Sequence, residues 1–324
     1  MLLLNKLQYN LLSNIELSSS LSLNALEQNQ DYEKLCLKFQ TKYKYKMIKT
    51  FSFSKEGFLG LFLELDAKIA ISQGESEAVV EAGLLYEKLG FSITWLELNR
   101  DGSVNLSNLN DIDFIFISSY VMDTFVKTDI SEIKKTTKAK IISNASAHYD
   151  ENSDALYFDS YKLTGFALSG VLVFDDEIFK LISLGFMDTI ALKLSLDALQ
   201  AQSFNYKLKS KFLKELKENF KEDIYFFVSP NSTLEYSLHF GLKGIKAREF
   251  IRTLALFKIF ITNGEGCSLG LAKPSRVIQA MGYSEEQSRN SIEFSFVNEI
   301  SDKEIESIIK TMRLKYTQLI SFND

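Results

Sequence analysis

The chain has 324 residues, of which 46% are hydrophobic and 24% are charged, so it can bury a full core. Its net charge is −5 and no basic patch stands out, which argues against a nucleic-acid partner. The opening MLLLNKLQYNLL is too short and too interrupted by polar residues for a signal peptide. No window reaches the ~18 uninterrupted apolar residues that would indicate a membrane span.

The first half of the chain alternates strand-like and helix-like segments. Strands are expected at 67–72, 92–98, 113–120 and 139–146, and helices at 74–90 and 129–138. This alternation predicts βαβ crossovers and a mostly parallel sheet. Two further strands, 155–160 and 169–175, follow without room for a helix between them, which predicts an antiparallel or edge pair.

After about residue 190 the pattern changes. Leu208, Phe212, Leu216 and Phe220 recur every fourth residue, within a long helical stretch expected over 190–221. Three strand-like segments follow, with helices between them: 223–230, 248–264 and 291–297. Two capping boxes, Ser284-x-x-Gln287 and Ser301-x-x-Glu304, mark helix starts. The last helix is expected to bury one side, made of Ile305, Ile308, Ile309, Met312 and Tyr316.

The changing pattern divides the chain into three parts. We expect an N-terminal segment at 1–50, a large α/β domain with a mixed, mostly parallel sheet at 51–200, and a smaller α+β domain at 201–324.

The two cysteines, Cys36 and Cys267, cannot form a disulfide framework and lack the spacing of metal ligands. A reducing, cytoplasmic setting and the absence of a metal site fit this usage.

Two residues are candidates for chemistry. Lys162 follows an apolar run in YFDSYKLTG, and a lysine leaving a buried strand can form a Schiff base, because desolvation lowers its pKa. Cys267 lies in the glycine-rich segment NGEGCSLGLAKPS, where an exposed cysteine could be a nucleophile. The ordinary alternatives are a lysine on an exposed turn and a small buried cysteine.

Taken together and in this order, these segments resemble the cysteine desulfurases, the NifS-like branch of the class V aminotransferase family of PLP-dependent enzymes. The run GEGCSLGLAKPSRVIQAMGYSEEQSRNSIEFSFVNEISDKEIESII is similar to the family's cysteine loop and the helices and strand that follow it. SYKLTGFALSGVLV stands in place of the family's lysine motif, glycine-rich turn and buried strand.

The resemblance implies a type I PLP-dependent transferase fold in a homodimer with active sites at the subunit interface. Lys162 would hold pyridoxal 5′-phosphate (PLP) as an internal aldimine. Cys267 would take the sulfur of substrate cysteine as a persulfide, releasing alanine, and would pass it to a sulfur acceptor protein. The residues implied to bind the cofactor are Lys162, Ser54, Ser76, Asn144, Ser160 and Thr189.

Several of these positions depart from the family's pattern. Ser76 replaces a histidine that stacks on the PLP ring, and Asn144 replaces an aspartate that pairs with the ring nitrogen. Ser54 and Lys55, in FSFSKEG, remain to contact the phosphate. Thr189 matches a threonine that reaches the neighbouring subunit's phosphate.

The substrate side departs as well. Asp159 replaces a serine, Tyr161 replaces a histidine, and Glu293 replaces the arginine that clamps the substrate carboxylate, with Arg289 as a candidate substitute. The only histidines are His148 and His239.

Three hypotheses follow. The chain is a working cysteine desulfurase, or an inactive family member that serves as a binding or scaffold dimer, or a PLP enzyme with a changed substrate.

Overall fold

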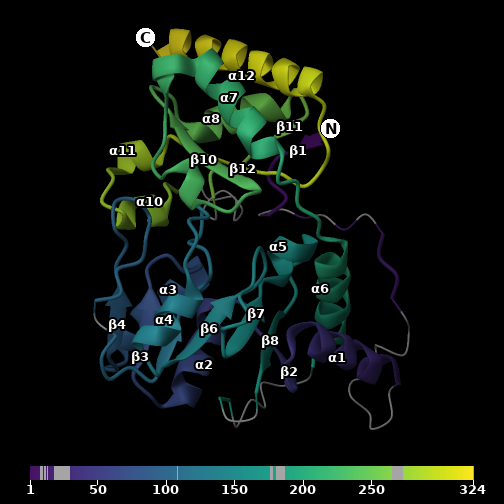
Figure 1. Ribbon diagram of the computed structural model, residues 1–324, viewed down its shortest axis with the longest axis vertical. Coiled ribbons are helices and arrows are strands. Elements are labelled where there is room, and N and C mark those ends of the chain that lie inside the picture. Colours follow the sequence, from purple (N-terminus) through teal and green to yellow (C-terminus); the bar gives the residue numbers. More distant parts are fainter. Residues whose placement is uncertain are drawn as a thin grey trace.

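A seven-stranded mixed sheet forms the lower half of the molecule in Figure 1, with the strand order β2-β8-β7-β6-β5-β3-β4. The computed structural model describes residues 1–7, 10, 12, 14–17, 30–107, 109–175, 178–179, 187–264 and 273–323. The strands of this sheet are β2 (Met47–Phe51), β3 (Ile69–Ser72), β4 (Ile93–Leu96), β5 (Phe114–Phe116), β6 (Lys140–Asn144), β7 (Ala155–Phe158) and β8 (Gly170–Phe174). Four neighbouring pairs are parallel, and only β8 runs against its neighbours β7 and β2. The predicted mixed, mostly parallel sheet is confirmed.

Helices cover both faces of this sheet. One face packs against α2 (Lys55–Leu65) and α3 (Glu77–Lys88), whose side chains share a core with alternate residues of the strands. The other face packs against α1 (Gln30–Tyr43) and α6 (Thr189–Ala201) at the β2-β8-β7 end and against α4 (Ile130–Thr136) at the other end. A strand buried on both faces is apolar throughout, which explains the unbroken run Val171–Phe174.

The pair β7 and β8 is antiparallel, as expected, but a short helix, α5 (Ser160–Thr164), lies between the two strands. The expectation that no helix fits there is wrong. The Asp159 side chain accepts hydrogen bonds from the backbone N–H groups of Tyr161 and Lys162, and Gly165 ends the helix with a φ of 81°. Five residues are too few for a periodic pattern, so only the caps define this helix.

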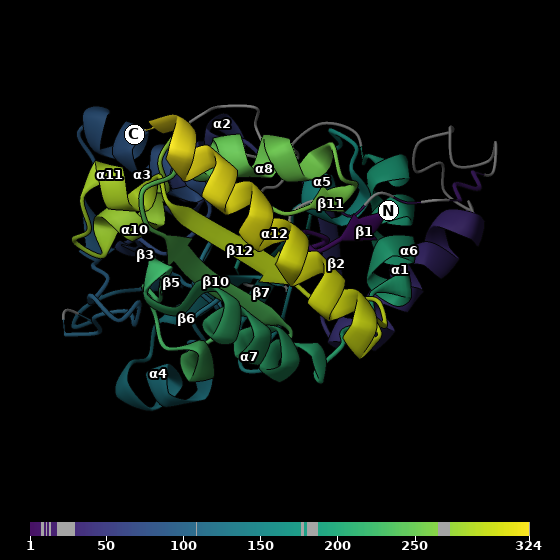
Figure 2. The same cartoon turned by 90° about the horizontal axis from the view of Figure 1, so that it is seen from above.

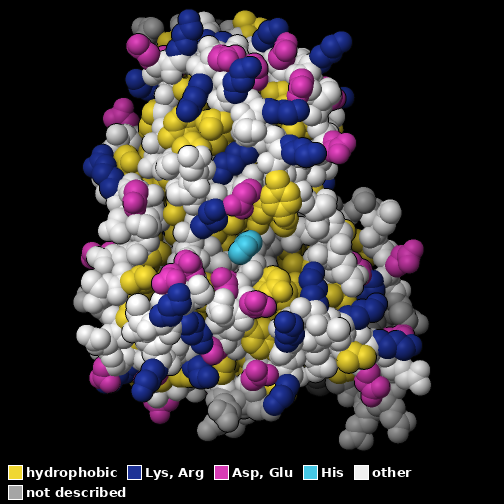
Figure 3. Space-filling model, in the orientation of Figure 1, with side chains coloured by type: hydrophobic (Ala, Val, Ile, Leu, Met, Phe, Trp, Pro, Cys, Tyr) yellow, Lys and Arg dark blue, Asp and Glu magenta, His cyan; other side chains and the backbone are white. Residues whose placement is uncertain are grey.

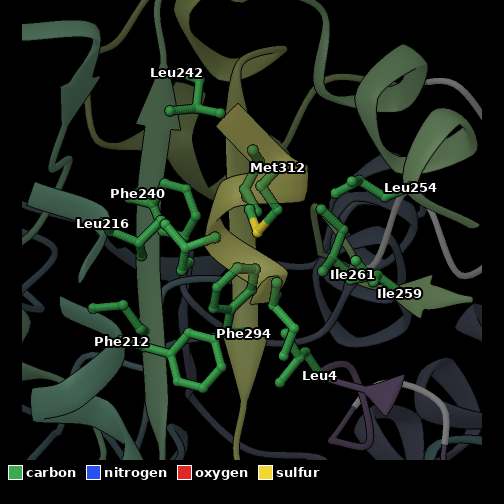
Figure 4. Packing of buried hydrophobic residues seen from close by; sticks show 14 of the residues in the cluster. Leu4, Phe212, Leu216, Phe240, Leu242, Leu254, Ile259, Ile261, Phe294 and Met312 are labelled. Atoms are coloured by element: carbon green, nitrogen blue, oxygen red, sulfur yellow. The ribbon is translucent and has the colours of Figure 1, made fainter. Parts of the chain in front are cut away.

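A second sheet lies above the first, with the order β12-β10-β9. Its strands are β9 (Ile224–Tyr225), β10 (Ser237–Leu242) and β12 (Ser291–Ser295), and all its pairs are antiparallel. The helices of this part are α7 (Leu208–Phe220), α8 (Ala247–Ala255), α10 (Arg276–Ala280), α11 (Glu285–Ser288) and α12 (Asp302–Asn323). Seen from above, α12 crosses this sheet diagonally (Figure 2). Phe240, Phe294 and Met312 meet in the apolar core between the sheet and its helices (Figure 4).

Two predicted segments in this part differ from the structure. The continuous helix expected over 190–221 is divided into α6 and α7, because Asn205 accepts a hydrogen bond from Lys207 N and its own backbone N–H binds Phe296 O. The strand expected at 248–264 is largely the helix α8, which buries Phe250 and Leu254, followed by the short strand β11 (Ile259–Phe260).

Both predicted capping boxes are present. Ser284 and Gln287 exchange hydrogen bonds at the start of α11, and Ser301 and Glu304 do so before α12. The expected buried side of the last helix is confirmed: it consists of Ile305, Ile308, Ile309, Met312 and Tyr316. Within the described ranges, no helix combines the length and the apolarity that crossing a bilayer requires.

The first 50 residues contact both parts of the molecule, and β1 (Leu2–Leu3) and β11 form a separate two-stranded sheet. This strand pair lies next to the small sheet, while α1 and β2 belong to the large one. The division of the chain at residues 50 and 200 remains a prediction.

Candidate functional site

Lys162 lies in the middle of α5 and is buried, with 7% of the residue's surface exposed. Its backbone N–H donates to Asp159, and its Nζ is 3.9 Å from the sulfur of Met122. The side chain lines a cleft of about 1160 Å³. The structure therefore excludes the ordinary alternative of an exposed turn for this lysine.

The Lys162 cleft lies beyond the carboxyl ends of the parallel strands, where open α/β sheets bind ligands. The start of α2, the start of α3, α5 and the loop before β8 form its walls. Its charged lining residues are Lys55, Lys162, Lys273, Glu56, Glu77, Glu81 and Asp159. Three basic and four acidic groups give the lining a small negative net charge, so a phosphate would be held locally, at the start of α2, and not by the charge of the cleft as a whole.

Ser54 caps α2 at the edge of this cleft. Its Oγ accepts a hydrogen bond from Gly57 N at 3.3 Å and lies 3.1 Å from Ser52 Oγ. Gly57 is required here, because a Cβ at this position would lie 1.8 Å from the carbonyl oxygen of Ser52. The positive end of an eleven-residue helix with Lys55 beside it is a suitable place for a phosphate.

Ser76 is the residue at the N-terminal boundary of α3, where its side chain makes no capping hydrogen bond, and it lines the same cleft. Its Oγ is buried and has no hydrogen-bond partner among the described residues. The preceding Glu75 lies beneath it and accepts hydrogen bonds at 2.5 Å from Ser118 Oγ and from Tyr157 Oη. Burial, and then the Glu75 carboxylate, raise the pKa of Tyr157 well above its ordinary value, so the phenol keeps its proton and donates.

Asn144 ends β6 and is fully buried. Its Oδ1 accepts from Ser146 N at 2.9 Å and from Tyr120 Oη at 3.3 Å. Its Nδ2 has no partner in the described part of the chain. A buried amide donor of this kind suits a neutral acceptor on a ligand.

Ser160 and Thr189, the other two predicted cofactor residues, are buried and, like Asn144, are not among the residues that line the cleft. Ser160 Oγ donates to Ser169 O at 2.5 Å and lies 2.9 Å from Ser195 Oγ, so it joins α5 to its neighbours. Thr189 is the first residue of α6, which Asp188 caps. Tyr161 and Asp159, by contrast, both line the cleft.

At this cleft, the part of the chain that contains the small sheet contacts loops of the seven-stranded sheet. Lys273 lines the cleft and pairs with Glu77, and Ser275 Oγ donates to Asp123 at 2.7 Å. Arg276 donates to the backbone carbonyls of Gln73 and Glu75. None of these contacts was expected, because each joins segments far apart in the sequence and has no local pattern.

Cys267 lies outside the described residues. The described residues on either side of it, Gly264 and Lys273, both lie against the large sheet's loops. A Cβ on Gly264 would lie 2.4 Å from the Asp123 carboxylate, and Lys273 pairs with Glu77. Of the two candidates for chemistry, the structure thus locates Lys162 and the two ends of the segment that carries the cysteine.

Glu293 lies on β12 and is fully buried, directly opposite His239 on β10. Arg289, the candidate substitute for a clamping arginine, donates from Nε and Nη2 to Glu285 on α11. Among the described residues, no group of three or more His, Cys, Asp or Glu side chains is arranged to hold a metal ion.

We expect Gly264→Ala to destabilise the protein by about 1–3 kcal/mol, because it forces a side chain into a positive φ and against Asp123. Gly60→Ala is the matched control, since open space surrounds Gly60 within α2 and alanine favours a helix. Urea unfolding of both variants measures the difference. Equal stability of Gly264→Ala and the wild type would contradict this account of the contact.

Comparison with known proteins shows which known folds this chain is similar to. No family model matches the chain. A cysteine desulfurase, IscS, of Pseudomonas syringae pv. tomato is 22% identical over 276 residues, which are 72% of this chain and 66% of that protein. A NifS-like protein of known structure superposes with a TM-score of 0.77 at 13% identity, covering 98% of this chain and all of that one. A NifS-like protein from Rickettsia africae gives a TM-score of 0.72 at 18% identity, covering 98% and 99%.

Proposed function

Because the chain has the fold of the NifS-like, class V PLP-dependent proteins and resembles a cysteine desulfurase, we propose that it binds PLP through the amine of Lys162. The observation that carries this proposal is the burial of Lys162 in a cleft of about 1160 Å³, which is ample for a small cofactor.

The residues at the cleft fit such a group. Ser54 and the start of α2 would hold the phosphate, with Lys55 supplying positive charge. The unpartnered Ser76 Oγ lines the cleft and is available to a polar atom of the ring. Asn144 is not among the residues that line the cleft, but its buried Nδ2 also lacks a partner in the described ranges and would be the donor to the ring nitrogen.

Asn144 limits the chemistry. PLP, when bound, supplies an electron sink, whose strength depends on a proton at the ring nitrogen. A carboxylate ~4 Å from that proton is worth ~4 kcal/mol at an effective dielectric of 20, and an uncharged amide does not supply this energy. Asn144 would therefore hold an unprotonated nitrogen. We infer that ordinary cysteine desulfuration is lost or much slower than with a carboxylate at this position.

A second candidate is an ordinary cysteine desulfurase that works as a cytoplasmic homodimer. It is favoured by the two ends of segment 265–272, since Gly264 lies against Asp123 and Lys273 lines the cleft. In this candidate Cys267 accepts the sulfur and an acceptor protein removes it, while Thr189 contributes to the site of the neighbouring subunit.

One experiment separates the two. Titration with PLP is expected to turn the purified protein yellow, and cysteine is expected to yield no sulfide or alanine above the level without protein. With a reducing thiol added to release sulfide from any persulfide, equal amounts of alanine and sulfide, lost in a Cys267→Ala variant that stays yellow, would favour the second candidate. A protein that stays colourless at saturating PLP would contradict both and support the inactive binding or scaffold protein.

A further inference from the structure

The basic residues of the Lys162 cleft offer little to a substrate carboxylate. The proposed cofactor uses Lys162 and Lys55, and Lys55 already lies 3.9 Å from Glu56. The third basic residue of the lining, Lys273, is paired with Glu77 at 3.4 Å. Among the described residues that line the cleft there is no arginine to clamp a carboxylate. A substrate carboxylate would therefore have to compete for a lysine that is already paired.

Glu81 is the charged group of this cleft that is left over. Its carboxylate has neither an ion pair nor a hydrogen bond among the described residues, and the residue is half-buried. It lies on α3 one turn after Glu77, and both side chains line the cleft. Asp159, by contrast, accepts hydrogen bonds from the backbone at the start of α5. Like charges four residues apart on a helix repel each other, so a cation beside Glu81 would relieve this repulsion.

Ser76 provides a second, independent sign of a ligand at the same helix. It is 1% exposed and lines the cleft, yet its Oγ has no hydrogen-bond partner within the described ranges. A buried hydroxyl without a partner is unusual in a folded protein. A serine hydroxyl can donate one hydrogen bond, here to an atom of the cofactor ring, and still accept another from a cation. The start of α3 therefore presents two acceptors, Ser76 Oγ and the Glu81 carboxylate.

Surface charge outside the cleft does not provide a comparable preference on the face seen in Figure 3. Acidic and basic side chains are interspersed over that face. Interspersed charges of both signs create no broad field that would attract ligands of one sign. A preference for one sign of ligand would therefore come from the lining of the cleft.

We propose that Glu81 binds an ammonium or guanidinium group of the ligand, with Ser76 as a further acceptor. The substrate class is then an amine that carries a second, cationic group, and not an amino acid that presents its carboxylate here. This inference deepens the proposed function, on which it rests for the place of PLP at Lys162. The cleft, of about 1160 Å³, is large enough for a small substrate beside the cofactor.

Propylguanidinium and butyrate are matched probes, because they share a three-carbon chain and carry planar head groups of opposite charge. Neither forms a Schiff base with PLP. Ligand-observed NMR titration of the purified full chain, at low salt and saturating PLP, measures their dissociation constants. We expect propylguanidinium to bind about fivefold or more tightly than butyrate, because a charge-assisted hydrogen bond to Glu81 adds to its affinity.

Two variants of Glu81 test the origin of this preference. Glu81→Gln, which keeps the shape of the side chain, is expected to bring the two dissociation constants within about twofold of each other. Glu81→Lys is expected to reverse their order. Glu87→Gln is the control, because it makes the same charge change at an exposed position of α3 that is not among the lining residues. It keeps an acceptor for Trp95 Nε1 and should leave the preference intact.

The same titration in Lys162→Ala protein without PLP separates this proposal from the cofactor proposal. A preference for propylguanidinium that persists there supports the cation site, whatever the colour of the wild type with PLP. A yellow wild type with equal affinity for the two probes would overturn the cation site and leave the cofactor proposal standing. Binding of neither probe, loss of the preference in Lys162→Ala, or an unchanged preference in Glu81→Gln would also overturn the cation site.

Discussion

The Lys162→Ala variant is expected to bind PLP at least about a hundredfold more weakly than the wild type and to stay colourless at PLP concentrations that turn the wild type yellow. Lys162 is the cleft lysine that α5 holds in a buried position, with its Nζ beside Met122. The covalent bond that this amine would supply has no substitute in the variant. A visible absorbance titration with PLP, followed by gel filtration, measures both colour and retention.

Lys273→Ala is the matched control for this experiment. Lys273 lines the same cleft, but its side chain is half exposed and pairs with Glu77. It should therefore leave the visible band unchanged. A yellow Lys162→Ala protein would show that another amine holds the cofactor. Equal loss of colour in both variants would show that the effect is not specific to Lys162.

Glu75→Ala is expected to lower the free energy of unfolding by about 2–6 kcal/mol. The buried carboxylate accepts from Ser118 and from Tyr157, and its removal leaves two buried hydroxyls without this acceptor, at ~1–3 kcal/mol each. Urea unfolding followed by circular dichroism measures the loss.

Glu77→Ala, two residues along the chain, is the comparison for Glu75→Ala. Its carboxylate makes a partly exposed ion pair with Lys273, worth at most about 1 kcal/mol. If the two variants lost the same stability, the buried hydrogen bonds of Glu75 would not have the importance given to them here.

Most of the fold was predictable, because long periodic segments dominate it. The alternation from β3 to β6 predicted parallel crossovers, and the spacing of Phe212, Leu216 and Phe220 predicted the buried side of α7. The helix α5 and the break between α6 and α7 were not predictable in this way. Single side chains, Asp159 and Asn205, set them through hydrogen bonds to the backbone.

Some residues of the candidate site were likewise predictable from the sequence, and others were not. Lys162 was found from its motif, and the structure places it in a cleft with Ser54 and Ser76. The sequence did not predict the contacts of Asp123, Ser275 and Arg276. These contacts join loops of the two sheets that are about 150 residues or more apart in the chain, so no local sequence pattern indicates them. The roles of the predicted site residues remain proposals.

The contact made by Arg276 has a consequence for how a ligand exchanges with the cleft. The Arg276 guanidinium donates two hydrogen bonds to the backbone carbonyls that follow β3. These bonds hold the part of the chain that contains the small sheet against the part that contains the seven-stranded sheet. A hinge motion that broke both would cost about 3–6 kcal/mol, at ~1.5–3 kcal/mol for each bond from a charged donor. Fewer than about one molecule in a hundred would then be open at any moment. A ligand would therefore enter and leave the cleft while the two parts of the chain stay in contact.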